Sequence, residues 1–145
     1  MDLILTATLF EQDLLRAHLV EPIHSEVAGR TRVQGRIGAR AVMLVETGMG
    51  AVNCAHALSC VLQSHAPAVA WQVGVGGAYA QSGLDLGDVV VASEENYGDI
   101  GVRLDDGWHG VEETIGIPLF TRNDQTYFNR FVLDSARGEK MATQL

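Results

Sequence analysis

A glutamate stands just beyond the first apolar run of the chain, where a carboxylate could do acid–base chemistry. The run at residues 3–5 is typical of a buried strand, and Glu11 follows it at the start of a helix predicted over residues 11–20. A carboxylate beside a bound water can take its proton during hydrolysis. The same residue type in a first helical turn also interacts favourably with the helix dipole, which is the more ordinary role. Spacing alone therefore makes Glu11 a candidate general base.

Two glycine-bearing turns follow other predicted strands. Thr47-Gly48-Met49-Gly50 precedes a helix predicted over residues 52–64, and the loop at residues 74–78 (GVGGA) follows a strand predicted over residues 68–73. Glycine lets the backbone approach a ligand closely, and free N–H groups at a helix start can bind water, a hydroxyl or an anion. The GVGGA loop has neither the spacing of a dinucleotide-binding loop nor the Gly-Lys-Ser/Thr of a phosphate loop. Taken alone, each is more often a structural turn.

The elements that must position these groups indicate an α/β fold with one central sheet in a single domain over residues 1–145. We expect strands over residues 3–5, 31–37, 40–45, 68–73 and 88–92, and helices over residues 11–20, 52–64 and 123–135. The first helix would bury Leu14, Leu15 and Leu19 and leave Gln12 outside its apolar stripe. Residues 97–118 are predicted to be a loop region, and residues 137–145 a frayed tail. Ligands bind such sheets at the carboxyl ends of strands, where all three candidate features lie.

The order of these features resembles the nucleoside phosphorylase/nucleosidase family. A glutamate after the first strand, a T-G-M-G turn, a G-V-G-G-A loop and an L-G-D-V-V-V-A-S run follow one another as they do in that family. The resemblance covers residues 1 to about 103 and is most specific at residues 45–53 and 72–99. It implies a three-layer fold around a central mixed sheet, and cleavage of the bond between a purine and a ribose carbon.

The resemblance also implies roles for individual residues. Glu11 matches the glutamate that holds and helps to activate the attacking water. Met49 and Gly50 match the turn that lines the ribose pocket. The loop that passes the base and the sugar comprises Val75, Gly76 and Gly77.

Two positions depart from the phosphorylases of this family. Those enzymes carry arginine at the position of Gln72 and serine or threonine at the position of Val75, where both help to hold phosphate. Gln72 has no positive charge and the Val75 side chain cannot donate a hydrogen bond, so water is the predicted nucleophile. Among the hydrolases, the stretches GGAY, SGL and ASEENYGDIGV resemble futalosine hydrolase more than methylthioadenosine/S-adenosylhomocysteine nucleosidase. This predicts release of hypoxanthine from futalosine, a step of menaquinone biosynthesis.

The leaving-group side of the reaction has no convincing candidate after residue 103. Family members hold the ribose hydroxyls with a Met-Glu pair and assist the purine with an aspartate, but Met141 is followed by Ala142 and nothing directs Asp124 or Asp134 to the pocket. We therefore expect a C-terminally incomplete fold that is inactive, or nearly so, by itself. The alternatives left open are a methylthioadenosine/S-adenosylhomocysteine nucleosidase, a phosphorylase, and a non-catalytic binding or oligomerisation module.

The composition argues against several classes of protein. A formal net charge of −8 and scattered basic residues argue against a nucleic-acid partner. The loose group of Arg30, Arg32, Arg36 and Arg40 is predicted to be a solvated face. The sequence has no apolar run long enough for a membrane span, and its start has no basic segment of a signal peptide, so we expect a cytoplasmic protein.

Neither a metal site nor a disulfide is indicated. Cys54 and Cys60 lie six residues apart on a predicted helix, on different faces, and are expected to be buried thiols. His109 is interpreted as an ordinary loop residue and residues 105–106, both aspartate, as a solvated turn. We expect no metal and no cofactor. A homodimer is implied because residues 97–102 (YGDIGV) match a segment that runs towards the dimer interface in the family.

Overall fold

The computed structural model describes residues 1–143, which belong to two compact units, Met1–Tyr79 and Ala80–Leu145. The elements of the first unit are β1 (Asp2–Thr6), the 3-10 helix η1 (Phe10–Gln12), α1 (Asp13–Ala17), β2 (Val20–Val27), β3 (Arg30–Ile37), β4 (Arg40–Glu46), α2 (Ala51–Leu62) and β5 (Val69–Gln72). Each unit is described separately below. The single domain expected from the sequence stays a prediction.

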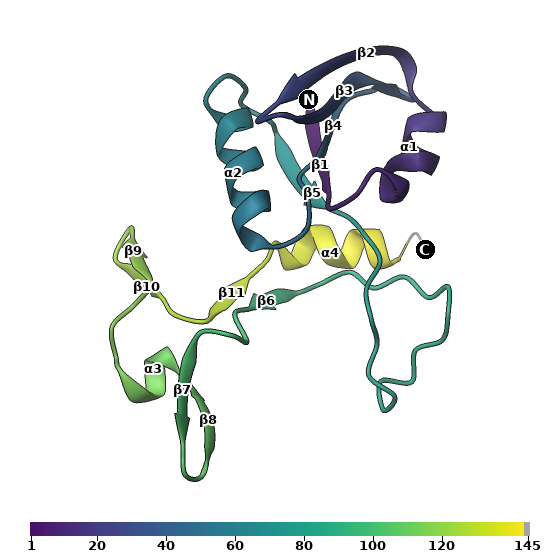
Figure 1. Ribbon diagram of the computed structural model, residues 1–145. Helices are drawn as coiled ribbons and strands as arrows, with labels where there is room; N and C mark the ends of the chain where they lie inside the picture. The colour runs from purple at the N-terminus through teal and green to yellow at the C-terminus, as the bar shows by residue number, and fades with distance from the viewer. Residues whose placement is uncertain (144–145) are drawn as a thin grey trace. The chain divides into compact units, whose positions relative to one another are not determined.

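The first unit contains one mixed sheet with strand order β2-β3-β4-β1-β5. β1, next to the edge strand β5, runs parallel to β4 on one side and to β5 on the other. β2, β3 and β4 form an antiparallel meander beside it. The strands predicted over residues 31–37 and 40–45 are confirmed as a hairpin with its turn at residues 38–39, and the positive φ of +57° at Gly38 explains the glycine there. Helices α2 and α1 lie on either side of the central strands (Figure 1).

The core lies between the sheet and α2. Alternate residues of β1 and β4 point towards that helix, as the period of two in a strand requires. The core residues of this cluster are Leu3, Leu5, Met43, Val45, Ala57 and Val61. Val33 and Leu44, paired across β3 and β4, are also fully buried but lie outside that cluster. The sheet is therefore covered on both faces at β4, which explains the continuous apolar run in that strand.

The helix predicted over residues 11–20 is wrong in length and in orientation. The segment forms η1 and the five-residue helix α1, and the chain then enters β2, a strand that the sequence pattern did not predict. Leu14, expected in the apolar stripe, is 79% exposed, whereas Gln12, expected outside it, is completely buried. Neither side-chain amide atom of Gln12 has a hydrogen-bond partner within residues 1–143. The tighter turn of the 3-10 segment rotates the side-chain directions relative to an ideal α-helix.

The second unit consists of short strand pairs and two helices. Its elements are β6 (Glu94–Asn96), β7 (Gly101–Leu104), β8 (Gly107–Gly110), α3 (Val111–Thr114), β9 (Phe120–Arg122), β10 (Gln125–Tyr127), β11 (Arg130–Val132) and α4 (Ser135–Ala142). β7 pairs with β8, β9 with β10, and β6 with β11. Asn129 connects the β6–β11 pair to the β7–β8 pair, because its side chain accepts from the Val111 N–H and donates to the carbonyl oxygens of Tyr97 and Ile100.

The helix predicted over residues 123–135 is also wrong. Residues 120–127 form the hairpin of β9 and β10, and the helix α4 begins later, in the part predicted to be a frayed tail. Asn123 and Asp124 occupy the turn with φ of 51° and 60°, which Asn and Asp tolerate better than most residues. Phe120, Tyr127 and Phe131 stack on one another, with ring centroids 4.6–6.1 Å apart.

The buried strand predicted over residues 88–92 is absent from the described chain. These residues have no strand assignment, and Val89 and Val90 are each 66% exposed. A strand covered on both faces needs neighbouring strands and a layer on each side, and no described residue supplies them here. Among residues 1–143, no helix combines the length and the apolar character needed to cross a membrane.

Candidate active site

Three strands of the first unit end at one edge of the sheet. Because β1, β4 and β5 are parallel, Thr6 lies opposite Glu46, and the preceding Leu5 lies opposite Gln72. The N–H and the hydroxyl of Thr47 both donate to the carbonyl oxygen of Thr6, over 2.8 and 3.1 Å. The T-G-M-G turn is therefore fixed to the end of β1. The sequence correctly predicted that the glutamate, this turn and the glycine loop come together.

The carboxylate of Glu11 bridges the ends of β1 and β5. Its Oε1 accepts a hydrogen bond of 3.0 Å from the backbone N–H of Val75. Its Oε2 accepts from both the backbone N–H and the hydroxyl of Thr8, each over 2.9 Å. Three donors on two loops thus hold one side chain, which is strong evidence that its orientation is defined by the fold.

These hydrogen bonds keep Glu11 ionised. The pKa of its carboxyl is lowered from the ordinary value, chiefly by the Val75 N–H and next by the Thr8 hydroxyl. A charged carboxylate that is already oriented can accept a hydrogen bond from a water and stabilise positive charge that develops on a nearby carbon. The structure therefore places Glu11 in the state that its predicted role requires.

Gly74 makes the contact between Glu11 and the loop possible. A Cβ at this position would lie 2.6 Å from Oε1 of Glu11 and 3.2 Å from its Cδ. The carboxylate occupies the space of a side chain, so glycine is needed here for close approach. Gly76 and Gly77 have no heavy atom within 4 Å of such a Cβ, so the first unit gives no packing reason for these two glycines.

A hollow of about 240 Å³ opens beside this carboxylate. It is lined by Phe10, Glu11, Leu14, Val73, Gly74 and Val75. Its walls are apolar apart from Glu11 and backbone groups, an arrangement common in small-molecule sites. Met49 and Gly50 lie exposed at the start of α2, on the turn that Thr47 fixes to β1. The substrate-binding roles of Met49, Gly50, Val75, Gly76 and Gly77 stay predictions.

Sequence reasoning missed Thr8, and although it placed Gly74 in the glycine loop, it missed the contact of Gly74 with Glu11. Thr8 and Glu11 form a T-x-x-E spacing, which is the pattern of a capping box in which the glutamate reaches back to a backbone N–H three residues earlier. That signal was available. The crowding at Gly74 could not be read from the sequence, because it depends on the position of a residue 63 places earlier in the chain.

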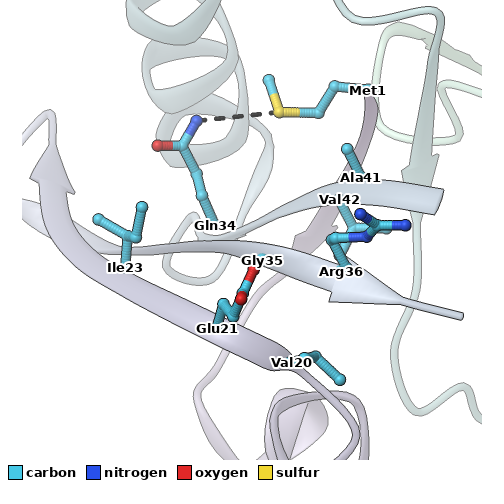
Figure 2. A pocket seen from close by; sticks show the side chains of 9 residues that line it. All are labelled: Met1, Val20, Glu21, Ile23, Gln34, Gly35, Arg36, Ala41 and Val42. Atoms are coloured by element: carbon cyan, nitrogen blue, oxygen red, sulfur yellow. Dashed lines mark hydrogen bonds between the residues drawn. The ribbon is translucent and has the colours of Figure 1, made fainter. Parts of the chain in front are cut away.

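A second hollow, of about 320 Å³, lies at the opposite end of β3 and β4. Figure 2 shows its lining, which includes Val20, Ile23 and Arg36, with Gln34 donating to the sulfur of Met1 over 3.8 Å. None of the predicted site residues lies there. It is therefore separate from the strand-end edge that holds Glu11.

No group of His, Cys, Asp and Glu side chains that could hold a metal ion occurs within residues 1–143. In the second unit, Nε2 of His109 bonds Oδ1 of Asp106 over 2.9 Å, and Nδ1 lies 3.4 Å from Glu113. Asp106 is exposed in the turn between β7 and β8, as predicted. Cys54 and Cys60 are free thiols and half-buried, so the expectation that they are fully buried is wrong.

Comparison with known proteins identifies the family of this strand-end site. The model of the phosphorylase superfamily matches residues 3–132. The chain belongs to the phosphorylase superfamily. The nucleoside phosphorylase-like fold expected from the sequence is thereby confirmed, with its mixed central sheet in the first unit.

Individual members of the superfamily match over most of this chain. The 5′-methylthioadenosine/S-adenosylhomocysteine nucleosidase of Aeromonas salmonicida is 34% identical over 92 residues, which are 63% of this chain and 40% of that protein. The futalosine hydrolase of Thermus thermophilus is 34% identical over 101 residues, 70% of this chain and 42% of that protein. A solved 5′-methylthioadenosine/S-adenosylhomocysteine nucleosidase of Streptococcus pneumoniae, with a transition-state inhibitor, superposes with a TM-score of 0.77 at 26% identity and covers 100% of this chain.

The chain spans about 40% of the length of these curated relatives and 58% of the solved nucleosidase. The shared part includes both units described here. The activity, substrate and assembly of the whole protein are accordingly treated as proposals.

Proposed function

We propose that the protein is a purine-nucleoside N-glycosidase that transfers the ribosyl group to water, with 5′-methylthioadenosine or S-adenosylhomocysteine as its substrate. The observation that carries the proposal is the oriented carboxylate of Glu11 between the ends of β1 and β5. In the reaction, the bond from the purine nitrogen to the ribose carbon breaks and a water oxygen bonds to that carbon. Glu11 would bind the water and take its proton.

Water is favoured over phosphate as the nucleophile by the charges at this edge. Glu11 is ionised, and the backbone N–H of Val75 in the loop donates to it, so this N–H is not free to bind a phosphate. A phosphate beside this loop would meet a like charge at short range, which costs more in a partly desolvated site than in water. Gln72 adds no positive charge to compensate.

The choice of substrate differs from the order of preference derived from the sequence. Futalosine came first there, whereas the comparisons give more support to the alternative, a methylthioadenosine/S-adenosylhomocysteine nucleosidase. Futalosine remains the second candidate, because the futalosine hydrolase of Thermus thermophilus is 34% identical to this chain over 101 residues.

The test is release of free purine from 5′-methylthioadenosine, S-adenosylhomocysteine and futalosine, each with and without phosphate. We expect free purine and a sugar product without a phosphate at the ribose carbon that bore the purine. We also expect a rate that does not change when phosphate is added. A strict requirement for phosphate would contradict the proposal, as would a lack of turnover of all three nucleosides by the longest natural form of the protein. The 145-residue chain assayed alongside tests the prediction that it is inactive, or nearly so, by itself.

A further inference from the structure

Arg30 places a positive charge directly against the T-G-M-G turn. It is the first residue of β3, beside the end of β4 (Figure 1). A Cβ at Gly48 would lie 2.9 Å from one terminal nitrogen of Arg30 and 3.1 Å from the central guanidinium carbon. The guanidinium therefore rests on the backbone of Gly48, in the space that a side chain would fill. Gly48 has a φ of +80°, so both its conformation and this contact favour glycine.

The side of the sheet on which Arg30 lies follows from the strand register. Arg30 pairs with Val27 across β2 and β3, and directly paired residues point to the same face. Val27 packs against the core cluster that includes Ala57 and Val61 of α2. The Arg30 side chain therefore runs on the α2 face towards the turn that begins this helix. Arg30 itself is half-buried.

Arg30 has no counter-ion among residues 1–143. Within the described part of the chain it forms no hydrogen bond and no ion pair, and no acidic oxygen lies within 4 Å of it. Two other arginines of the same group do have partners. Arg32 donates to Ser25 over 2.8 Å, and Arg40 pairs with Asp2 over 2.9 Å. The expectation that the four arginines are a solvated face is therefore wrong for Arg30 and Arg32, which are half-buried. A half-buried guanidinium that no protein group engages is available to bind an anion.

Arg30 and Glu11 contact turns that follow neighbouring strand ends at one edge of the sheet. The guanidinium of Arg30 lies against Gly48, just past the end of β4, and Glu11 bonds the loop after β5. β4 and β5 flank β1, so their ends are two strand spacings apart, about 10 Å. On the proposed function, a water held by Glu11 attacks the ribose carbon that bears the purine. A substituent on the far side of the sugar would then extend along this edge towards the T-G-M-G turn and Arg30.

We propose that Arg30 binds a carboxylate on the sugar substituent of the purine nucleoside, so that the protein prefers nucleosides with a carboxylate at this position to those without one. This inference rests on the proposed function. A guanidinium matches a carboxylate with two parallel N–H donors, and such pairs are stronger than bonds between neutral groups. S-Adenosylhomocysteine carries an amino acid carboxylate, whereas methylthioadenosine carries an uncharged methylthio group. Arg30 thus favours the former as substrate.

The experiment compares the dissociation constants of S-adenosylhomocysteine and its methyl ester, which differ in the carboxylate alone. Binding is measured by calorimetry on the longest natural form of the protein, for wild type, Arg30→Met and Arg36→Met. Arg36 is the matched control, because it lies on the same strand six residues away, about 20 Å, beside the hollow in Figure 2. Both variants remove one positive charge and keep most of the apolar stem.

We expect wild type and Arg36→Met to bind the acid at least about tenfold more tightly than the ester, and Arg30→Met to bind both equally. Equal binding of acid and ester by wild type would overturn the inference, as would a preference that survives in Arg30→Met or disappears in Arg36→Met. If the acid is preferred through Arg30 but no nucleoside is hydrolysed, the proposed function fails while this inference stands. If no nucleoside binds, both fail.

Discussion

Replacing Gly74 by alanine should displace the carboxylate of Glu11 while leaving the fold intact. The new Cβ would lie 2.6 Å from Oε1, and ordinary contact begins at 3.4 Å, so the two atoms must separate by 3.4 − 2.6 = 0.8 Å. Oε1 is the end of a flexible side chain, and it can move away by giving up its bond to the Val75 N–H. A misplacement of about 1 Å in a reacting group costs on the order of 10²-fold in rate. We expect this loss in kcat, with little change in thermal stability.

The pH dependence offers a second measure of the same displacement. The Val75 N–H is the largest cause of the lowered pKa of Glu11, so Gly74→Ala should raise that pKa towards its ordinary value. Because activity needs the ionised form, the acidic limb of the pH–rate profile should move to higher pH. Gly98→Ala is the control, because a Cβ there meets nothing within 4 Å.

A double variant separates a local effect on Glu11 from a general disturbance of the loop. If Gly74→Ala acts through the carboxylate, it should add little further loss in a Glu11→Gln background. Near-normal kcat in Gly74→Ala with an unmoved acidic limb would refute the reasoning. So would a full additional loss in the double variant.

Three further predictions follow from the same site and from the family resemblance. Glu11→Gln should keep the fold and lose about 10²–10⁴-fold in kcat, because an amide cannot accept the proton of water, and a near-normal rate would reduce Glu11 to a structural carboxylate. The pKa of Glu11 is lower in the folded protein than its ordinary value of 4.5, so its contribution to stability is present above that value and is lost as the pH falls through the folded pKa. Urea unfolding should therefore show wild type losing its advantage over Glu11→Gln as the pH falls through this range, and a difference independent of pH would contradict the assignment. Light scattering at micromolar concentration should find a homodimer, and a monomer would count against it.

Local patterns in the sequence predicted the elements whose pattern has a single interpretation. The apolar runs of β1 and β4, the Gly38 turn and the long helix α2 were found within a few residues. β2 was missed because it is exposed along most of its length and has no alternation of apolar and polar residues to detect. The helix predicted over residues 123–135 rested on aromatic residues spaced by four, which here belong to two separate strands.

The candidate site was predictable to the level of which segments meet. Parallel strands bring their carboxyl ends together, so Glu11, the T-G-M-G turn and the loop after β5 had to be neighbours. The individual contacts were not predictable, because the bond from Val75 to Glu11 and the position of Arg30 on Gly48 depend on side-chain directions across 64 and 18 residues of sequence. The burial of Gln12 in place of Leu14 had the same cause, a local change of helix type.

The place of β1 between β4 and β5 has a consequence for how the chain folds during synthesis. β1 leaves the ribosome before both of its neighbours, residues 40–46 and 69–72, so both of its edges are unpaired until these strands are synthesised. Closing the sheet then requires β1 to pair with β5, for example Leu5 with Gln72, and such distant pairings form late because loop-closure entropy opposes them. Until β5 emerges, an apolar strand edge is open to pairing with another nascent chain.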